Sequence, residues 1–211
     1  MRISLFGRYL LKMSSPKPKP ENKKCQSLPS SGFGSVMVGV LFDDGIVLAI
    51  NSMGNLIYYL DDHIYCGASS TGFDRESLME VSTKLENIAR NNSNKGVTVA
   101  QALDLIVKLY EQVEIAELLL AGEDPSGLHL IALKCPGTSA RVNYAALGPG
   151  SAASSEYLKS QWRPDMNLKH AEQLARAALL IGSMSKVGVD VCIIFKRSPE
   201  SATRVEGHDS S

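Results

Sequence analysis

Short apolar runs separated by polar turns fill the first part of the chain after its leader. Residues 35–42 and 46–50 are apolar and rich in β-branched side chains, and an Asp-Asp-Gly sequence joins them. Asp-Gly between two such runs is a strong signal for a β-hairpin. Residues 56–60 and 64–66 have the same character and predict a second strand pair, with an Asp-Asp turn between them.

Apolar residues recur at helical spacing in the segments that follow. The first helix is expected to begin at Phe73 or Asp74, and the second after Thr98, with a glutamine three residues later that completes a capping box. A third helix is expected from residue 152 to about 161, and a fourth after Asn167 as its N-cap. The buried stripes of the first, second and fourth helices are Leu78, Val81, Leu85, Ile88 and Ala89; Ala102, Leu105, Ile106, Leu109 and Tyr110; and Leu168, Ala171, Leu174, Ala175, Ala178 and Leu179.

Further strands are expected at residues 116–121, 128–133, 144–147 and 190–195, the first two as a hairpin around Asp-Pro-Ser-Gly. The resulting order is strands, two helices, strands, two helices and a final strand. Runs of strands followed by runs of helices favour an α+β fold over an alternating βαβ fold. We therefore expect a four-layer α/β/β/α sandwich, in which two packed antiparallel sheets carry a helix pair on each outer face.

Composition and charge exclude several classes of protein. The 211 residues are 44% hydrophobic and 21% charged, which is ordinary for one globular domain with a full core. The 22 basic and 22 acidic residues give no electrostatic case for a nucleic-acid or membrane partner. The four cysteines form no close pair, which argues against a zinc site and favours a reducing, intracellular setting, with Cys66 and Cys192 as buried thiols. No metal or cofactor is expected.

The chain divides into three parts by composition. Residues 1–34 combine a short basic segment with a Ser-, Pro- and Lys-rich stretch, and are expected to be a disordered leader. Residues 35–196 form the expected domain, and residues 197–211 a polar, loose C-terminal tail.

Several motifs resemble those of proteasome β-type subunits, and the resemblance covers roughly residues 34–196. Its most specific mark is Trp162-Arg163-Pro164-Asp165-Met166 before a helix. The other matching stretches are Gly34-Ser35 with the following strand, Asp44-Gly45-Ile46-Val47-Leu48-Ala49, the segment 64–74, Ala146-Leu147-Gly148-Pro149-Gly150-Ser151 and Val189-Asp190-Val191-Cys192-Ile193-Ile194. Among β-type subunits, the chain is most similar to the trypsin-like one.

The resemblance implies an N-terminal-nucleophile hydrolase of the threonine peptidase family. In that family the subunit cuts its own Gly-Thr bond, and the freed threonine attacks the substrate while its α-amine acts as the base. The resemblance also implies that residues 1–34 are a propeptide that ends at Gly34, as the alternative to a disordered leader. It further implies the same layered fold, other α- and β-type subunits as partners in stacked heptameric rings, and a location in the cytoplasm and nucleus.

The supporting catalytic positions of the family are changed together in this sequence. The nucleophile position holds Ser35, whose hydroxyl can still attack. The aspartate position holds the neutral Asn51, and the lysine position holds Leu56; no lysine or arginine occurs between residues 42 and 73. The serine that assists the nucleophile is replaced by Pro149. A later family aspartate is missing, while Ser185 preserves a nearby serine, and the groove loop between residues 51 and 56 is short.

Other polar residues carry weaker signals. His63 beside Asp61 and Asp62 is more typical of a polar turn than of a metal or acid–base site. His129 lies in an apolar hairpin and is expected to be exposed at an edge or satisfied locally. Glu111, Glu114 and Glu117 are expected to form a solvated face near a helix end. No histidine has a spacing that suggests a Ser-His-Asp triad with Ser35.

Three hypotheses follow for the function. The first is a non-catalytic β-type subunit that contributes to ring assembly, with Ser35 as a vestigial nucleophile. The second is a serine-type endopeptidase that frees Ser35 by cleaving the Gly34–Ser35 bond. The third is a divergent paralogue that modulates proteasome composition.

Overall fold

The computed structural model describes residues 35–51, 56–68, 75–92, 96–111, 116–135, 137–183 and 188–197. The predicted leader and most of the predicted tail lie outside these ranges. The described strands form two antiparallel sheets. Sheet A has four strands in the order β8-β1-β2-β9, and sheet B has five in the order β3-β4-β5-β6-β7. The strands of sheet A are β1 (Met37–Phe42), β2 (Gly45–Asn51), β8 (Tyr144–Leu147) and β9 (Val189–Phe195). Those of sheet B are β3 (Ile57–Asp61), β4 (Ile64–Ala68), β5 (Ala116–Asp124), β6 (Gly127–Cys135) and β7 (Thr138–Arg141).

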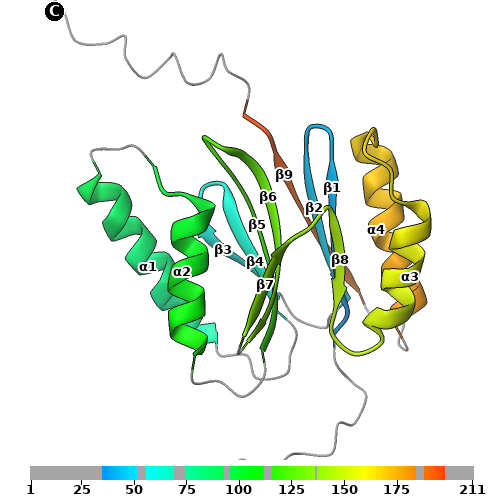
Figure 1. Cartoon of the computed structure of the whole chain (residues 1–211), viewed down its shortest axis with the longest axis horizontal. Helices are drawn as coiled ribbons and strands as arrows, with labels where there is room; N and C mark the ends of the chain where they lie inside the picture. Colours follow the sequence, from blue (N-terminus) through cyan, green and yellow to red (C-terminus); the bar gives the residue numbers. More distant parts are fainter. Residues whose placement is uncertain are drawn as a thin grey trace, which may run out of the picture. The chain divides into compact units, whose positions relative to one another are not determined.

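The two sheets pack face to face, and a helix pair covers each outer side (Figure 1). Helices α1 (Arg75–Asn91) and α2 (Val99–Tyr110) cover sheet B, while α3 (Ser151–Gln161) and α4 (Leu168–Gly182) cover sheet A. This arrangement confirms the four-layer α/β/β/α sandwich expected from the sequence.

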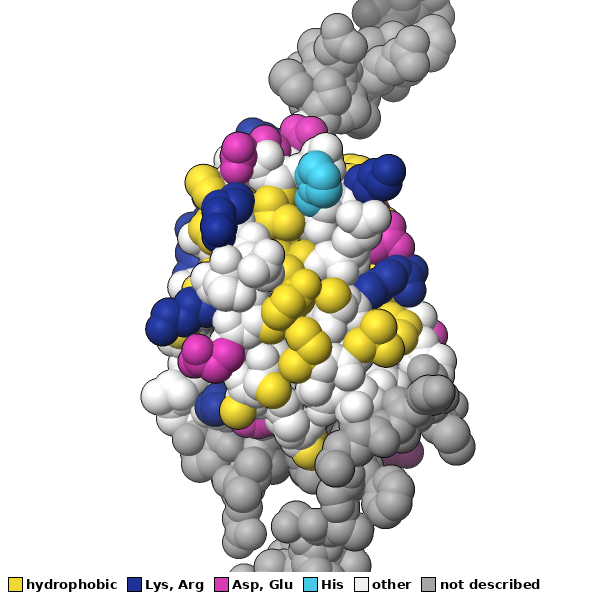
Figure 2. All heavy atoms as spheres, turned by 90° about the vertical axis from the view of Figure 1, so that its right-hand side faces the viewer, with side chains coloured by type: hydrophobic (Ala, Val, Ile, Leu, Met, Phe, Trp, Pro, Cys, Tyr) yellow, Lys and Arg dark blue, Asp and Glu magenta, His cyan; other side chains and the backbone are white. Residues whose placement is uncertain are grey.

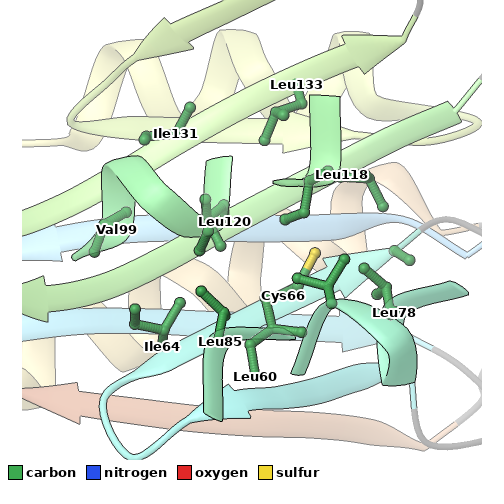
Figure 3. Close-up of a cluster of buried hydrophobic side chains, with 14 of the residues drawn as sticks. Leu60, Ile64, Cys66, Leu78, Leu85, Val99, Leu118, Leu120, Ile131 and Leu133 are labelled. Carbon is green, nitrogen blue, oxygen red and sulfur yellow. The ribbon is translucent and has the colours of Figure 1, made fainter. Parts of the chain in front are cut away.

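Each interface between layers has its own hydrophobic cluster. Leu60, Leu78, Leu85 and Leu120 belong to the cluster between sheet B and its helices, where the side chains of β3, β4, β5 and β6 face those of α1 and α2 (Figure 3). A second cluster joins sheet A to α3 and α4. The third lies between the sheets and contains Met37, Ile46, Leu48, Ile50, Leu119, Ala121 and Leu130, among others. Burial of these apolar surfaces is the main force that holds the layers together.

Local signals set the helix starts where the sequence predicted them. Thr98 accepts a hydrogen bond from the Gln101 backbone N–H at 3.2 Å, and the Gln101 side chain accepts one from the Thr98 N–H at 2.9 Å, which confirms the capping box. Asn167 caps α4 by accepting a hydrogen bond from the His170 N–H at 3.0 Å.

Two features of the fold differ from what the sequence indicated. The sequence did not predict β7, because the four side chains from Thr138 to Arg141 are all exposed and carry no alternating apolar pattern; pairing with β6 alone defines the strand. Cys66 is buried as expected, but Cys192 is only half-buried, since it lies on the edge strand β9.

Within the described ranges, no helix is both long and apolar enough to cross a membrane.

Candidate functional site

The nucleophile position lies under a glycine-rich turn at one end of sheet A. Ser35 is half-buried and lies two residues before the start of β1. Gly148 has a φ of 94°, and a Cβ atom on it would collide with the Ser35 carbonyl oxygen. Gly150 has a φ of 86° and approaches the Gly182 carbonyl in the same way at the end of α4. Both positions therefore require glycine, which adopts a positive φ without strain and leaves room for the facing backbone.

Asn51 lies beside this turn at the end of β2. Its backbone N–H donates to the Val36 carbonyl at 3.0 Å, so Asn51 lies opposite the residue that follows Ser35. The side chain is 6% exposed, and its Nδ2 atom donates to the Ser183 hydroxyl. The aspartate position of the family thus holds a neutral amide that is hydrogen-bonded to the residue at the end of α4. The sequence did not indicate this contact with Ser183.

Leu56, at the lysine position of the family, faces the hydrophobic cluster between the sheets. It is half-buried against that cluster, and its carbonyl accepts a hydrogen bond from the Ala68 N–H at 3.1 Å. A leucine in this environment contributes apolar packing and can supply neither positive charge nor a proton.

Glu117 is a site residue that the sequence reading placed wrongly. The strand predicted at residues 116–121 is confirmed as β5, but Glu117 was expected on a solvated face near a helix end, and its side chain is only 24% exposed. Its carboxylate accepts a hydrogen bond from the Gly148 N–H at 2.7 Å and lies 3.3 Å from the Lys134 ammonium group. Glu117 therefore fixes the glycine-rich turn from the opposite sheet. The apolar pattern around Glu117 could not predict this hydrogen bond, because Gly148 is 31 positions away in the sequence.

A second polar cluster lies at the other end of the sandwich, in the turn between β5 and β6. Asp124 accepts hydrogen bonds from the Val99 N–H at 2.9 Å, the Ser126 hydroxyl at 2.6 Å and the Ser126 N–H at 2.8 Å, and lies 3.0 Å from His129 Nε2. Burial alone would raise the pKa of Asp124, but the hydrogen bonds from Ser126, Val99 and His129 outweigh it and lower the pKa to about 2.

This Asp-Ser-His cluster is structural. In a catalytic triad the aspartate and the serine contact different nitrogens of the imidazole ring. Here His129 Nε2 contacts both Asp124 and Ser126, so the ring cannot pass a proton between them. The cluster instead ties the β5–β6 turn to the first residue of α2. His129 is thus satisfied locally, as one of the two expectations for it stated.

The remaining candidates form no site in the described part of the chain. Asp62 and His63 form the β3–β4 turn, and Asp62 accepts a hydrogen bond from the Tyr59 hydroxyl at 2.8 Å. No group of three or more His, Cys, Asp or Glu side chains is placed to hold a metal ion among the described residues. Ser185, the Gly34 side of the predicted cleavage bond and the short groove loop lie outside the described ranges.

The arrangement brings together three of the sequence-predicted positions, and the fourth, Leu56, lies on the inter-sheet side. Ser35, Asn51 and the turn that contains Pro149 converge with the end of α4, and Leu56 lies at the start of β3. A serine hydroxyl is present, but the two positions that would supply a carboxylate and an ammonium group hold an amide and an alkyl chain. Pro149 offers neither a hydroxyl nor a backbone N–H.

Comparison with known proteins agrees with this geometry. A family model described as proteasome subunit matches residues 33–194. The proteasome subunit beta type-2 of Saccharomyces cerevisiae is 27% identical over 192 residues, which cover 82% of this chain and 73% of the yeast protein. The proteasome subunit beta 2 of Pyrobaculum aerophilum is 27% identical over 193 residues, which cover 82% of this chain and 95% of that protein. The proteasome subunit beta type-7-B of Arabidopsis thaliana is 25% identical over 185 residues, which cover 79% of this chain and 68% of that protein. Because the family match spans most of the chain and these relatives are all β subunits, the chain belongs to the proteasome subunit family, among its β-type members.

Proposed function

We propose that this chain is a non-catalytic β-type subunit of the proteasome core particle, with a role in ring assembly for ubiquitin-dependent protein breakdown. The observation that carries the proposal is Leu56, which packs against the inter-sheet cluster at the position where the family resemblance requires a lysine. Without that cation, the field that activates a terminal hydroxyl and its amine is lost. Asn51 and Pro149 remove two further supporting groups, and such groups act as a unit.

The partners in this proposal are other α- and β-type subunits in stacked heptameric rings, in the cytoplasm and nucleus. The intact four-layer core supports it, because a subunit that acts by shape must keep its fold. The outer helix layer also supports it. Figure 2 shows the face formed by α3 and α4, where apolar side chains make a strip flanked by charged ones. On α4, Leu180 and Ile181 expose 69% and 48% of their surface. A contiguous apolar surface rimmed by polar residues is typical of a contact with another protein.

The test combines assembly with activity. Tagged wild-type chain and the Ser35→Ala variant are co-expressed with the other subunits, and particles are separated by gradient sedimentation. We expect both proteins to sediment with the core particle, and particles that contain either one to hydrolyse basic-residue peptides at the same rate. A chain that sediments only as a free monomer would contradict the assembly role.

Mass measurement of the N-terminus within the particle addresses the serine-type alternative. A chain that begins at Ser35, with peptide hydrolysis that disappears in the Ser35→Ala variant, would replace the proposal by the endopeptidase. An intact leader excludes that alternative, because the α-amine of Ser35 would still be part of a peptide bond. If the chain enters particles only in small amounts beside an ordinary subunit, the third reading, a paralogue that modulates composition, is favoured.

A further inference from the structure

A small cavity lies between the first turns of α2 and the β5–β6 hairpin, beside the Asp-Ser-His cluster. Its volume is about 330 Å³, and its apolar lining residues are Ala100, Leu103, Pro125 and Ile131. Every lining residue belongs to one of two stretches that the structure describes without a break, 96–111 and 116–135. Sites for small molecules are cavities of this kind, mostly apolar and with a few polar groups that orient the ligand.

The hydrogen bonds of the cluster decide which nitrogen of the His129 ring carries a proton. The Asp124 carboxylate, with a pKa of about 2, is ionised at neutral pH and can only accept. The Ser126 hydroxyl has one proton and donates it to Asp124 Oδ1 at 2.6 Å. His129 Nε2 lies 3.0 Å from the same Oδ1 atom and 2.8 Å from the Ser126 oxygen, and neither oxygen has another proton to offer. Nε2 therefore carries the hydrogen, and in the neutral ring Nδ1 holds the lone pair.

His129 Nδ1 is the acceptor that the cluster leaves open. No described residue donates a hydrogen bond to it, and the atom keeps contact with solvent although the side chain is only 13% exposed. The other polar groups of the lining are occupied. Asp124 Oδ2 accepts from the Val99 N–H at 2.9 Å, and the Thr98 hydroxyl takes part in the capping box with Gln101. Because an acceptor without a donor is costly beside apolar walls, Nδ1 sets the chemistry of what binds there.

Three classes of ligand do not match this lining. An anion would be repelled by the Asp124 carboxylate. A cation finds no open carboxylate oxygen and meets the partial positive charge at the start of α2. A metal ion needs several ligands, and the described part of the chain places no three His, Cys, Asp or Glu side chains to supply them.

A segment of polypeptide also fits the cavity poorly. Its backbone N–H and C=O groups would lose their water against the apolar lining residues, whose side chains offer them no hydrogen bonds. The volume of about 330 Å³ is at the lower end of the range for small ligands. The occupant that matches is a small molecule that is neutral, apolar over most of its surface and able to donate one hydrogen bond.

We propose that this cavity, which we call the His129 cavity, binds a small neutral hydroxyl compound of the alkylphenol type, whose O–H group donates a hydrogen bond to His129 Nδ1. The apolar body of the ligand packs against the side chains of α2 and β6. Asp124 strengthens the bond, because a carboxylate that holds the Nε2 proton makes Nδ1 a better acceptor. This inference goes beyond the proposed function and is independent of whether the chain is catalytic.

The test measures binding of para-cresol to the isolated full-length chain by nuclear magnetic resonance at pH 8, where a phenol is neutral because its pKa is about 10. Two control molecules are para-methylanisole, which has the same shape without the O–H donor, and para-hydroxybenzoate, which adds a negative charge. We expect saturable shifts of the Leu103 and Ile131 methyl signals with para-cresol. Affinity should be at least about tenfold weaker for each control.

The ¹⁵N signals of the His129 ring provide a direct readout of the contact. In the free protein at pH 8 we expect Nε2 to be protonated and Nδ1 to be unprotonated. Addition of para-cresol should shift the Nδ1 signal, and para-methylanisole should leave it unchanged, since only the phenol donates a hydrogen bond.

Ala100→Leu is the decisive variant, because it fills the cavity without changing any residue of the Asp-Ser-His cluster. We expect it to weaken para-cresol binding by about tenfold or more. The matched control is Ala152→Leu, since Ala152 is also an exposed alanine at the second position of a helix, in α3, and it should bind within about twofold of wild type. His129→Phe removes Nδ1, so para-cresol and para-methylanisole should bind to it equally. Circular dichroism checks that each variant is folded.

Several results would overturn the proposal. Absence of saturable para-cresol binding to the full-length chain is one, and equal binding of para-methylanisole by the wild-type chain is another. A protonated Nδ1 in the free protein at pH 8, or unchanged binding by Ala100→Leu, would also do so. Binding that appears only after residues 1–34 or 198–211 are removed would assign the cavity to a segment of the chain itself. None of these outcomes depends on assembly into the core particle, so each is distinct from a failure of the proposed function.

Discussion

Asp124 makes the stability of this fold sensitive to acid, and the size of the effect follows from its contacts. The carboxylate is 4% exposed and takes part in four close polar contacts with Val99, Ser126 and His129, which lower its pKa from 3.8 to about 2. A depression of nearly two units corresponds to about 2 kcal/mol of folding free energy, since one unit is worth about 1.4 kcal/mol. Because the pKa is lower in the folded state, this contribution is complete above pH 3.8 and is lost as the pH falls through 2.

The Asp124→Asn variant isolates this contribution. At pH 7 it should unfold with a free energy about 2 kcal/mol below that of wild type, because the amide cannot carry the charge that the four contacts stabilise. The measurement is urea unfolding of both proteins at a series of pH values from 7 down to 2. The difference between them should shrink as the wild-type carboxylate becomes protonated below pH 4.

Asp44→Asn is the matched control, since Asp44 is exposed in the β1–β2 turn. Its unfolding free energy should stay within about 0.5 kcal/mol of wild type at pH 7. The reasoning fails if the Asp124→Asn difference is the same at every pH, or if it is no larger than that of the control. Either result would mean that the cluster binds a neutral side chain as well as a carboxylate.

Three further predictions follow from single contacts. Gly148→Ala should destabilise the fold by about 1–3 kcal/mol in denaturant unfolding and by more than Gly127→Ala, because both have a positive φ but only Gly148 faces a backbone carbonyl; equal losses would contradict the collision. Leu85→Ala should cost about 2–5 kcal/mol in the same assay, since Leu85 is fully buried between α1 and sheet B, and a loss below about 1 kcal/mol would show that the cluster collapses around it. The hydrogen bond to Asp62 and partial burial raise the pKa of Tyr59 to about 12, so ultraviolet titration of Asp62→Ala should show this phenol ionising closer to 10; an unchanged titration would refute the assignment.

The sequence predicted the elements whose signals are local. The Thr98–Gln101 capping box, the Asn167 cap and the hairpin turn before Gly45 each depend on neighbouring residues, and the structure confirms all three. β7 was missed because its four exposed side chains carry no signal apart from their pairing with β6. Such a strand is specified by the neighbouring strand with which it pairs, and its own sequence carries no signal for it.

The candidate site was predictable only in part, for the same reason. The motif resemblance identified Ser35, Asn51, Leu56 and Pro149 as the positions to compare, and whether Ser35 is vestigial stays a prediction. The contacts of these residues come from distant parts of the chain. Asn51 meets Ser183 across 132 positions, and no pattern of hydrophobicity near either residue indicates that. Glu117 was misread because its hydrogen bond with the Gly148 turn lies outside any local motif.

The two sheets differ in how far apart their strands lie along the chain. Sheet B and its helix pair come from one continuous stretch, from Ile57 to Arg141, whereas sheet A takes β1 and β2 from before this stretch and β8 and β9 from after it. During synthesis, the half that contains α1 and α2 can therefore fold while the remainder is still being made. The β1–β2 hairpin must wait with an unpaired side until residues near 195 leave the ribosome, because Gly45 pairs with Phe195. While the residues between β2 and β9 are being made, the nascent chain thus carries an apolar hairpin with one unpaired side. We expect it to depend on chaperones in that interval more than a protein whose first strands pair at once.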